Sequence, residues 1–214
     1  VGLKKLQSPV SARAGNALAA FAMLLAIVAV IVEERIVSWT GVLAGIAIGS
    51  LVGGVSAYWV RMTAMPQMVG LFNGSGGGAS ALVSIEEYLS NPSIGGTATG
   101  VTILLGTLIG AVTFSGSFIA FAKLQELMTG NPITFRGQNL INGLLLLIIT
   151  AAGAAALGAF GVQDTLAAFY VFIALALLLG VLLVIPIGGA DMPVVISLLN
   201  SYSGIAGSAA GFVI

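Results

Sequence analysis

An uncharged run, WTGVLAGIAIGSLVGGVSAYW, extends from Trp39 to Trp59. At about 1.5 Å per residue, an α-helix between the two tryptophans would span about 30 Å. That length matches the hydrocarbon core of a bilayer, and aromatic residues at both ends are typical of the interfacial belts of membrane proteins. The run therefore predicts a transmembrane helix.

The rest of the chain has a matching composition. Of its 214 residues, 58% are hydrophobic and only 7% are charged, whereas a soluble domain carries about 25% charged residues. The seven basic and seven acidic residues cancel, which argues against a nucleic-acid partner. The sequence has no Cys and no His. This excludes disulfides, thiolate metal sites, Ser–His–Asp triads and the usual proton carrier near pH 7, and we expect no metal site.

Apolar runs of about 20 residues predict an all-α integral membrane protein, a polytopic helix bundle with seven spans in one transmembrane domain over residues 1–214. Ile214 stops inside an apolar run and Val1-Gly2-Leu3 is typical of the end of an earlier helix, so we expect a fragment. The predicted spans are Gly15–Val32, Trp39–Trp59, Pro66–Leu89, Ala98–Ala122, Asn139–Gly161, Leu166–Ile187 and Met192–Ile214.

The distribution of Lys and Arg predicts the orientation of these spans. On one side only Arg35 is basic, and the positive-inside rule makes the other side cytoplasmic. The N-terminus is then inside, and Asp191 lies at the cytoplasmic mouth of the last span. The basic residues on the predicted cytoplasmic side are Lys4, Lys5, Arg13, Arg61, Lys123 and Arg136, and we interpret Arg61, Lys123 and Arg136 as ordinary cytoplasmic anchors.

Glycines at a spacing of four predict close packing between helices. The second span has four of them, and the pairs Gly106/Gly110 and Gly207/Gly211 repeat the pattern. The segment NGSGGGAS, residues 73–80, is similar to a phosphate-binding loop, but it lies inside a predicted span and lacks the strand that such a loop follows. We interpret it as a weak point of a helix or a place where a neighbour approaches. The four glycines of the second span are Gly41, Gly45, Gly49 and Gly53.

Two segments match each other: MPQMVGLFN, Met65–Asn73, and MPVVISLLN, Met192–Asn200, share Met-Pro, Leu and Asn at the same offsets. Both begin at the predicted cytoplasmic surface, where Pro is easily accommodated in a first helical turn. Each Asn then lies about 10 Å inward. The fourth span runs the other way and places Ser117 about 8 Å from the same surface. The sequence thus predicts one polar layer containing Asn73, Asn200 and Ser117.

The polar residues have alternative interpretations. Asn200 is either interhelical glue or part of a polar lining for a water path. Asp191 suits a helix N-cap that accepts a backbone N–H, which does not exclude a second role. Glu86 and Glu87 are either interfacial or part of a proton exit. The face of the last span that favours a water path contains Ser197, Asn200, Ser203, Gly204, Gly207 and Gly211.

At GGADMPVVISLLNSYSG, Gly188–Gly204, the sequence resembles the proton-translocating nicotinamide nucleotide transhydrogenase family, in the membrane domain of its beta subunit. RMTAMPQMVGLFN, Arg61–Asn73, and GAVTFSGSFIAFAKL, Gly110–Leu124, resemble the same family in the same order. The similarity covers essentially all seven predicted spans. It implies one further span before Val1, and another span followed by a soluble NADP(H)-binding domain after Ile214.

The resemblance implies a function. Hydride would pass from NADH to NADP⁺ between soluble domains while protons cross the membrane inward. This chain would supply the proton route but neither the hydride-transfer site nor a bound cofactor, since NAD(H) and NADP(H) belong to the soluble domains. By the same resemblance, Asp191 matches the acid that couples to the NADP(H) domain, Asn200 the intramembrane Asn of the proton path, and Ser117 a polar residue of the fourth span.

The resemblance also implies partners and a location. The partners would be an alpha-type transhydrogenase subunit, the NADP(H)-binding domain and the lipid bilayer, in a dimer of complexes with no nucleic acid. The location would be the bacterial plasma membrane, or the mitochondrial inner membrane if the source is eukaryotic.

The sequence departs from the family at Asn73, where the family's usual protonatable His falls. We hypothesise that the alpha-type subunit supplies the titrating group; the alternatives are ordered water alone or a carboxyl group such as that of Glu86. A different functional class also fits the residues, namely a secondary transporter or channel for a small solute.

Overall fold

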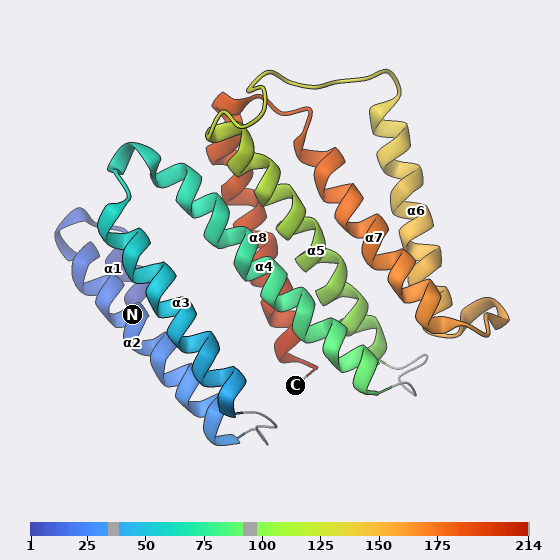
Figure 1. The fold of residues 1–214 in the computed structure, drawn as a ribbon, viewed down its shortest axis with the longest axis horizontal. Helices are drawn as coiled ribbons and strands as arrows, with labels where there is room; N and C mark the ends of the chain where they lie inside the picture. Colours follow the sequence, from blue (N-terminus) through green and yellow to red (C-terminus); the bar gives the residue numbers. More distant parts are fainter. Residues whose placement is uncertain (34–38, 92–97, 214) are drawn as a thin grey trace. The chain divides into compact units, whose positions relative to one another are not determined.

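The computed structural model describes residues 1–33, 39–91 and 98–213, and these residues form helices joined by short connections, without a strand (Figure 1). The predicted all-α helix bundle is thereby confirmed. The helices are α1 (Gly2–Leu6), α2 (Pro9–Glu33), α3 (Trp39–Trp59), η1 (Met62–Ala64), α4 (Met65–Ser90), α5 (Ala98–Leu124), α6 (Gln138–Ala156), η2 (Ala159–Gly161), α7 (Thr165–Val184), η3 (Gly189–Asp191) and α8 (Met192–Gly211).

Each predicted span falls on one of the helices α2 to α8. Five helices of the described chain, namely α2, α3, α5, α6 and α7, are long and apolar enough to cross a membrane. Helices α4 and α8 are less apolar because they contain many Gly, Ser and Asn residues, and their membrane crossing stays a prediction. Arg35 and Ile214, on which the predicted orientation and the last span depend, lie outside the described residues.

Several helix ends differ from the predicted spans: α2 begins at Pro9, before the predicted Gly15, and α6 and α7 end early for local reasons. Helix α6 ends at Ala156, before the predicted Gly161, and Gly158 follows it in the left-handed conformation at φ 83°. A glycine in this conformation is a common helix terminator. Helix α7 ends at Val184, before the predicted Ile187, because Pro186 has no backbone N–H with which to continue the helical hydrogen bonds.

The chain divides into two compact units, Val1–Trp59 and Val60–Ile214. In the first unit, α1 packs against α2, where Gly15 allows the approach: a Cβ there would lie 3.1 Å from the carbonyl oxygen of Gly2. None of the residues of α3 is buried. Within its own unit, the predicted glycine face of α3 therefore has no close neighbour at Gly45, Gly49 or Gly53.

In the second unit, α5 is the central helix. It packs against α4, α7 and α8, while α6 packs against α7 (Figure 1). Large apolar side chains on the outer faces, such as Leu147, Ile148 and Leu178, are exposed. Soluble proteins rarely expose so much contiguous apolar surface, whereas a bilayer solvates it. The packing thus agrees with the membrane character indicated by the composition.

Helices α4 and α5 approach most closely at Gly77 and Gly110. A Cβ at Gly110 would lie 2.7 Å from the carbonyl oxygen of Gly77 and 2.8 Å from the backbone nitrogen of Ala81. The segment NGSGGGAS is thus continuous helix whose glycines admit a neighbour, as one of the two sequence interpretations proposed. The Gly106/Gly110 pair serves the same contact, since Gly106 faces Ser84 of α4.

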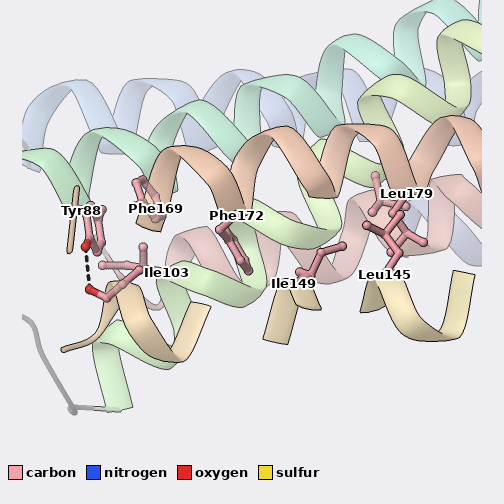
Figure 2. Close-up of a cluster of buried hydrophobic side chains, with 9 residues drawn as sticks. Tyr88, Ile103, Leu145, Ile149, Phe169, Phe172 and Leu179 are labelled. Atoms are coloured by element: carbon pink, nitrogen blue, oxygen red, sulfur yellow. Dashed lines mark hydrogen bonds between the residues drawn. The ribbon is translucent and has the colours of Figure 1, made fainter. Parts of the chain in front are cut away.

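A hydrophobic cluster that runs along α6 and α7 packs these helices against α4 and α5 (Figure 2). The ring of Tyr88 stacks on Phe169 with 3.7 Å between ring centroids. Its hydroxyl donates to the carbonyl oxygen of Ala156 at 2.6 Å, so this polar tip is satisfied where α6 ends. The buried apolar members labelled with Tyr88 in Figure 2 are Ile103, Leu145, Ile149, Phe169, Phe172 and Leu179.

Gly110→Ala is expected to destabilise the second unit, because the new methyl group would meet backbone atoms that cannot rotate away. Overpacking of this kind costs about 1–3 kcal/mol. Gly76→Ala is the matched control: a Cβ there meets no atom within 4 Å. Thermal unfolding of the purified protein in detergent should show a lower Tm for Gly110→Ala only. Equal Tm values for both variants would contradict the close approach.

Candidate functional site

A buried polar cluster joins three helices of the second unit, and Asn73 of α4 is its centre. Its Nδ2 donates a hydrogen bond to Ser117 Oγ of α5 at 2.9 Å. Its Oδ1 accepts a hydrogen bond from Ser203 Oγ of α8 at 2.8 Å. Asn73 is 7% exposed and Ser117 is fully buried. We call these three residues the Asn73 cluster.

The local sequence of α4 explains how the cluster forms. Gly70, Asn73, Gly74 and Gly77 lie at helical spacing on the buried face of α4. A Cβ at Gly74 would be only 3.2 Å from Ser117 Cβ, so glycine there lets α5 approach closely enough for the Asn73 amide to reach Ser117. Small residues thus bring two helix backbones together around a polar side chain, as is common in membrane bundles.

The two hydrogen bonds leave the Asn73 amide with further capacity. An Asn side chain has two N–H donors and an oxygen with two lone pairs, and the cluster uses one of each. The remaining donor and lone pair suit one or two water molecules. The cluster is neutral, so it can orient water and pass hydrogen bonds but cannot itself carry a charge at neutral pH.

The structure brings together two of the three residues predicted for the polar layer. Asn73 and Ser117 are in contact, whereas Asn200 is exposed on the outer side of α8 and is not a recorded partner of either. Ser203, one turn further along α8, takes the place next to Asn73. The sequence analysis placed Ser203 on the polar face of α8 without assigning it a contact. The sequence signal for this contact is the spacing of three residues between Asn200 and Ser203, which puts both residues on one side of α8.

Apart from Ser203, the polar face predicted for α8 is exposed in this unit. Ser197, Asn200, Gly204, Gly207 and Gly211 are all exposed, and a Cβ at Gly204 or Gly211 would meet no atom within 4 Å. The buried side of α8 is instead apolar, with Val195, Ile196, Leu199, Ala206, Ala209 and Ala210. In this unit, the exposed face therefore presents an amide and three glycines to the outside.

Asp191 occupies the N-cap position of α8, but its carboxylate makes no capping hydrogen bond. The predicted acceptance of a backbone N–H is therefore wrong. Asp191 ends the η3 turn with φ −91° and ψ −4°, whereas a capping residue usually has extended dihedrals that direct its side chain over the first turn. The side chain is exposed and free to meet a partner.

Lys123 was interpreted as an ordinary surface anchor, and this is wrong because the side chain is only 2% exposed. Its ammonium group donates to three backbone carbonyl oxygens next to the segment that leads into Asp191. Glu86 and Glu87, by contrast, bond to Ser90 and Asn91 at the far end of α4. They lie about 20 Å along the helix from Asn73.

Further hydroxyl groups lie buried in the second unit, and the sequence analysis did not identify them. Thr113 packs against Gly77, and Ser84 packs against Gly106. Together with Thr107, these hydroxyls have no hydrogen-bond partner within the part of the chain that the structure describes. Such groups are costly in a bilayer. They extend the polar character of the α4–α5 contact from the Asn73 cluster toward the other end of the helices.

Comparison with known proteins places this arrangement in a family. The model of the family described as NAD(P) transhydrogenase beta subunit matches residues 1–214, the full length of the chain. The chain belongs to the NAD(P) transhydrogenase beta subunit family. The resemblance seen at Gly188–Gly204 is thus confirmed. The chain is 40% identical over 219 residues to the NAD(P) transhydrogenase subunit beta of Rhodospirillum rubrum, and the subunit from a named strain of that organism matches equally.

The chain spans less than half the length of the curated relatives it matches. The alignment covers 99% of the chain and 46% of the R. rubrum subunit. The name of these relatives therefore refers to a longer protein. The Asn73 cluster and Asp191 lie in the part that the alignment covers.

Ser203→Ala is expected to weaken the packing of α8 against α4, because it removes the hydroxyl that donates to Asn73 Oδ1. Hydrogen bonds between membrane helices are worth about 0.6 kcal/mol on average and about 1.7 kcal/mol at most. Ser201→Ala is the control, since the Ser201 hydroxyl bonds only to the carbonyl oxygen of Ser197 in its own helix. In thermal unfolding in detergent, Ser203→Ala should have a lower Tm than the unsubstituted protein, and Ser201→Ala should not. An unchanged Tm would contradict the contact.

Proposed function

We propose that this chain is the proton-conducting membrane domain of a proton-translocating NAD(P) transhydrogenase. In the complete complex, hydride passes from NADH to NADP⁺ between soluble domains while protons move inward across the membrane. The observation that carries the proposal is the buried Asn73 cluster in a chain that belongs to the beta subunit family. NAD(H) and NADP(H) bind to the soluble domains, and this chain holds neither the hydride site nor a cofactor.

The Asn73 cluster would guide protons by ordering water. Its three side chains are neutral, and the sequence contains no His that titrates near pH 7. Water bound at the unused N–H and lone pair of Asn73 would nevertheless relay a proton along hydrogen bonds. Asn200 adds a second amide one turn away on α8, and the buried hydroxyls of Thr113 and Ser84 extend the route along the α4–α5 contact.

The titrating group would come from an alpha-type subunit of the complex. The face of α8 with Asn200, Gly204 and Gly207 is exposed in this unit. Exposure of an amide to lipid is costly, so a neighbouring helix is expected to cover it. Glycines let that helix approach closely. A partner subunit with no ionisable residue at the depth of Asn73 would rule out this source, and Glu86 or water alone would then have to serve.

Asp191 would stand where the NADP(H) domain docks. Its carboxylate is exposed, makes no capping bond, and lies at the start of the helix that carries Asn200 and Ser203. Occupation of the NADP(H) site can then bias the position of α8. A pump of this kind needs two states with different proton access, and the bound nucleotide shifts the balance between them.

The proposed location is the bacterial plasma membrane, with the Asp191 end facing the cytoplasm, or the mitochondrial inner membrane in a eukaryote. The proposed assembly is a dimer of complexes. A secondary transporter or channel for a small solute is the alternative, and the gene distinguishes the two. A transhydrogenase continues past Ile214 into a further span and a Gly-rich dinucleotide-binding domain.

Asn200→Leu tests the proton route in the complete complex, reconstituted in sealed vesicles. We would record internal pH while NADPH reduces an NAD⁺ analogue. The variant should lose proton movement together with coupled turnover, by about tenfold or more, because Leu cannot order water. Ser201→Leu, at the neighbouring exposed position, is the control and should keep most of the turnover. Assembly of each variant is checked by purification.

The other outcomes are equally decisive. An assembled Asn200→Leu complex that pumps normally would make Asn200 packing glue and remove it from the proton path. The wild-type complex would be supplied either with NADPH and an NAD⁺ analogue or with NADH and NADP⁺. If it moves no protons with either pair, the transhydrogenase proposal is contradicted and the transporter is favoured.

A further inference from the structure

Lys123 lies in the last turn of α5 and is 2% exposed, although its side chain is cationic. Its Nζ donates to the carbonyl oxygen of Ile185 at 2.6 Å, of Ile187 at 2.7 Å and of Asn131 at 3.2 Å. An ammonium group has three N–H donors. All three donors are therefore used, and each goes to backbone.

The three acceptors come from two segments that are distant in sequence. Ile185 and Ile187 follow the end of α7 and lead into Asp191, and Asn131 belongs to the loop between α5 and α6. Carbonyl groups at the end of a helix lack intrahelical donors and carry partial negative charge. Lys123 thus donates hydrogen bonds to carbonyl groups at and after the end of α7 and offsets their partial negative charge. This explains why a buried cation is tolerated here.

Two backbone hydrogen bonds join the same segments. Gly189 N donates to the carbonyl oxygen of Gly130 at 2.7 Å, and Ile133 N donates to that of Ile185 at 3.2 Å. A surface hollow of about 500 Å³ lies beside these bonds and borders Lys123, Met128, Thr129 and Gly189. Hydrogen bonds centred on Lys123 therefore hold this joint between the α5–α6 loop and the α7–α8 connection.

We propose that Lys123 is a positioning residue for coupling: it fastens the connection that carries Asp191 to the helix that carries Ser117. Ser117 lies about 9 Å further along α5 from Lys123. A force applied at Asp191 is then transmitted to the Asn73 cluster through α5 as well as through α8. The inference rests on the proposed function, because Asp191 and the Asn73 cluster acquire their roles there.

The absence of Cys from this chain allows a direct test of the joint. Gly130→Cys and Gly189→Cys place two thiols across it, since a Cβ at Gly189 would lie 3.4 Å from the Cα of Gly130 and a Cβ at Gly130 meets nothing within 4 Å. The pair is introduced into the complete complex, with its other cysteines replaced by Ser, and is bridged with a short bifunctional thiol reagent. Bridging is compared between complexes with Lys123 and with Lys123→Met.

With Lys123 present the bridge should form rapidly and leave coupled turnover unchanged, because the two segments stay together throughout the cycle. Lys123→Met should slow the bridging and lower proton movement and coupled turnover per assembled complex by about tenfold, within the range of typical coupling energies. Once formed, the bridge should restore most of that loss. Lys4→Met, the same substitution at an exposed position, should behave as wild type.

Three results would overturn the proposal: bridging that is equally fast without Lys123, a bridge that abolishes turnover when Lys123 is present, or a bridge that restores nothing in Lys123→Met. The last would indicate that the Lys123 charge itself matters. If Lys123→Met does not assemble, the bridged complex that retains Lys123 still tests the proposal. Loss of coupled turnover on bridging would show that the two segments must separate, and would overturn it. The bridging rates need no proton transport, so a failure of the proposed function is seen separately in the wild-type pH record.

Discussion

A buried amide needs hydrogen-bond partners because leaving its donors and acceptors unsatisfied is costly, and Asn73 finds two of these partners on neighbouring helices. Its bonds to Ser117 and Ser203 require α4, α5 and α8 to lie within side-chain reach of one another. The glycines of α4 make this possible, since side chains at Gly74 or Gly77 would push α5 away. The mutual approach of α4, α5 and α8 is thus tied to the hydrogen bonds of one amide.

This constraint also orders the functional elements along α5. The helix carries Ser117 in the Asn73 cluster and Lys123 at its end, where Lys123 holds the connection that leads into Asp191. Asp191 at the surface and the buried Asn73 cluster are consequently linked through two helices, α5 and α8. In the proposed transhydrogenase, nucleotide binding at the surface would change proton access inside the membrane through these rigid links, without any cofactor in this chain.

Much of the fold and part of the site could be predicted from sequence. The length and spacing of apolar runs predict helices, and counting residues from Pro66 and from the end of the fourth span placed Asn73 and Ser117 at one depth. Depth alone does not fix the rotation of a helix about its axis, so the contact of α8 fell to Ser203 and not to Asn200. The Asn73 cluster is thus only partly visible in sequence.

Two further differences between the predictions and the structure arise from local backbone geometry, which hydropathy does not describe. Lys123 stands at the end of a span, where Lys is usually an interfacial anchor, but the α5–α6 loop and the α7–α8 connection meet there and supply three carbonyl acceptors. Asp191 precedes Met-Pro as a capping residue would, yet the η3 turn gives it helical dihedrals and turns its carboxylate outward.

The central claim, that the Asn73 cluster lies on a water-filled proton route, is tested most directly by thiol accessibility at position 117. Ser117→Cys is introduced into the complete complex, with other cysteines replaced, and treated with a small charged thiol reagent. Ser115→Cys on the same helix is the control, because Ser115 packs toward Gly180 of α7, away from the cluster. The account predicts reaction at 117 that depends on bound NADP(H) and blocks turnover, with little reaction at 115. A thiol at 117 that never reacts in any nucleotide state, in a complex that still pumps, would contradict it.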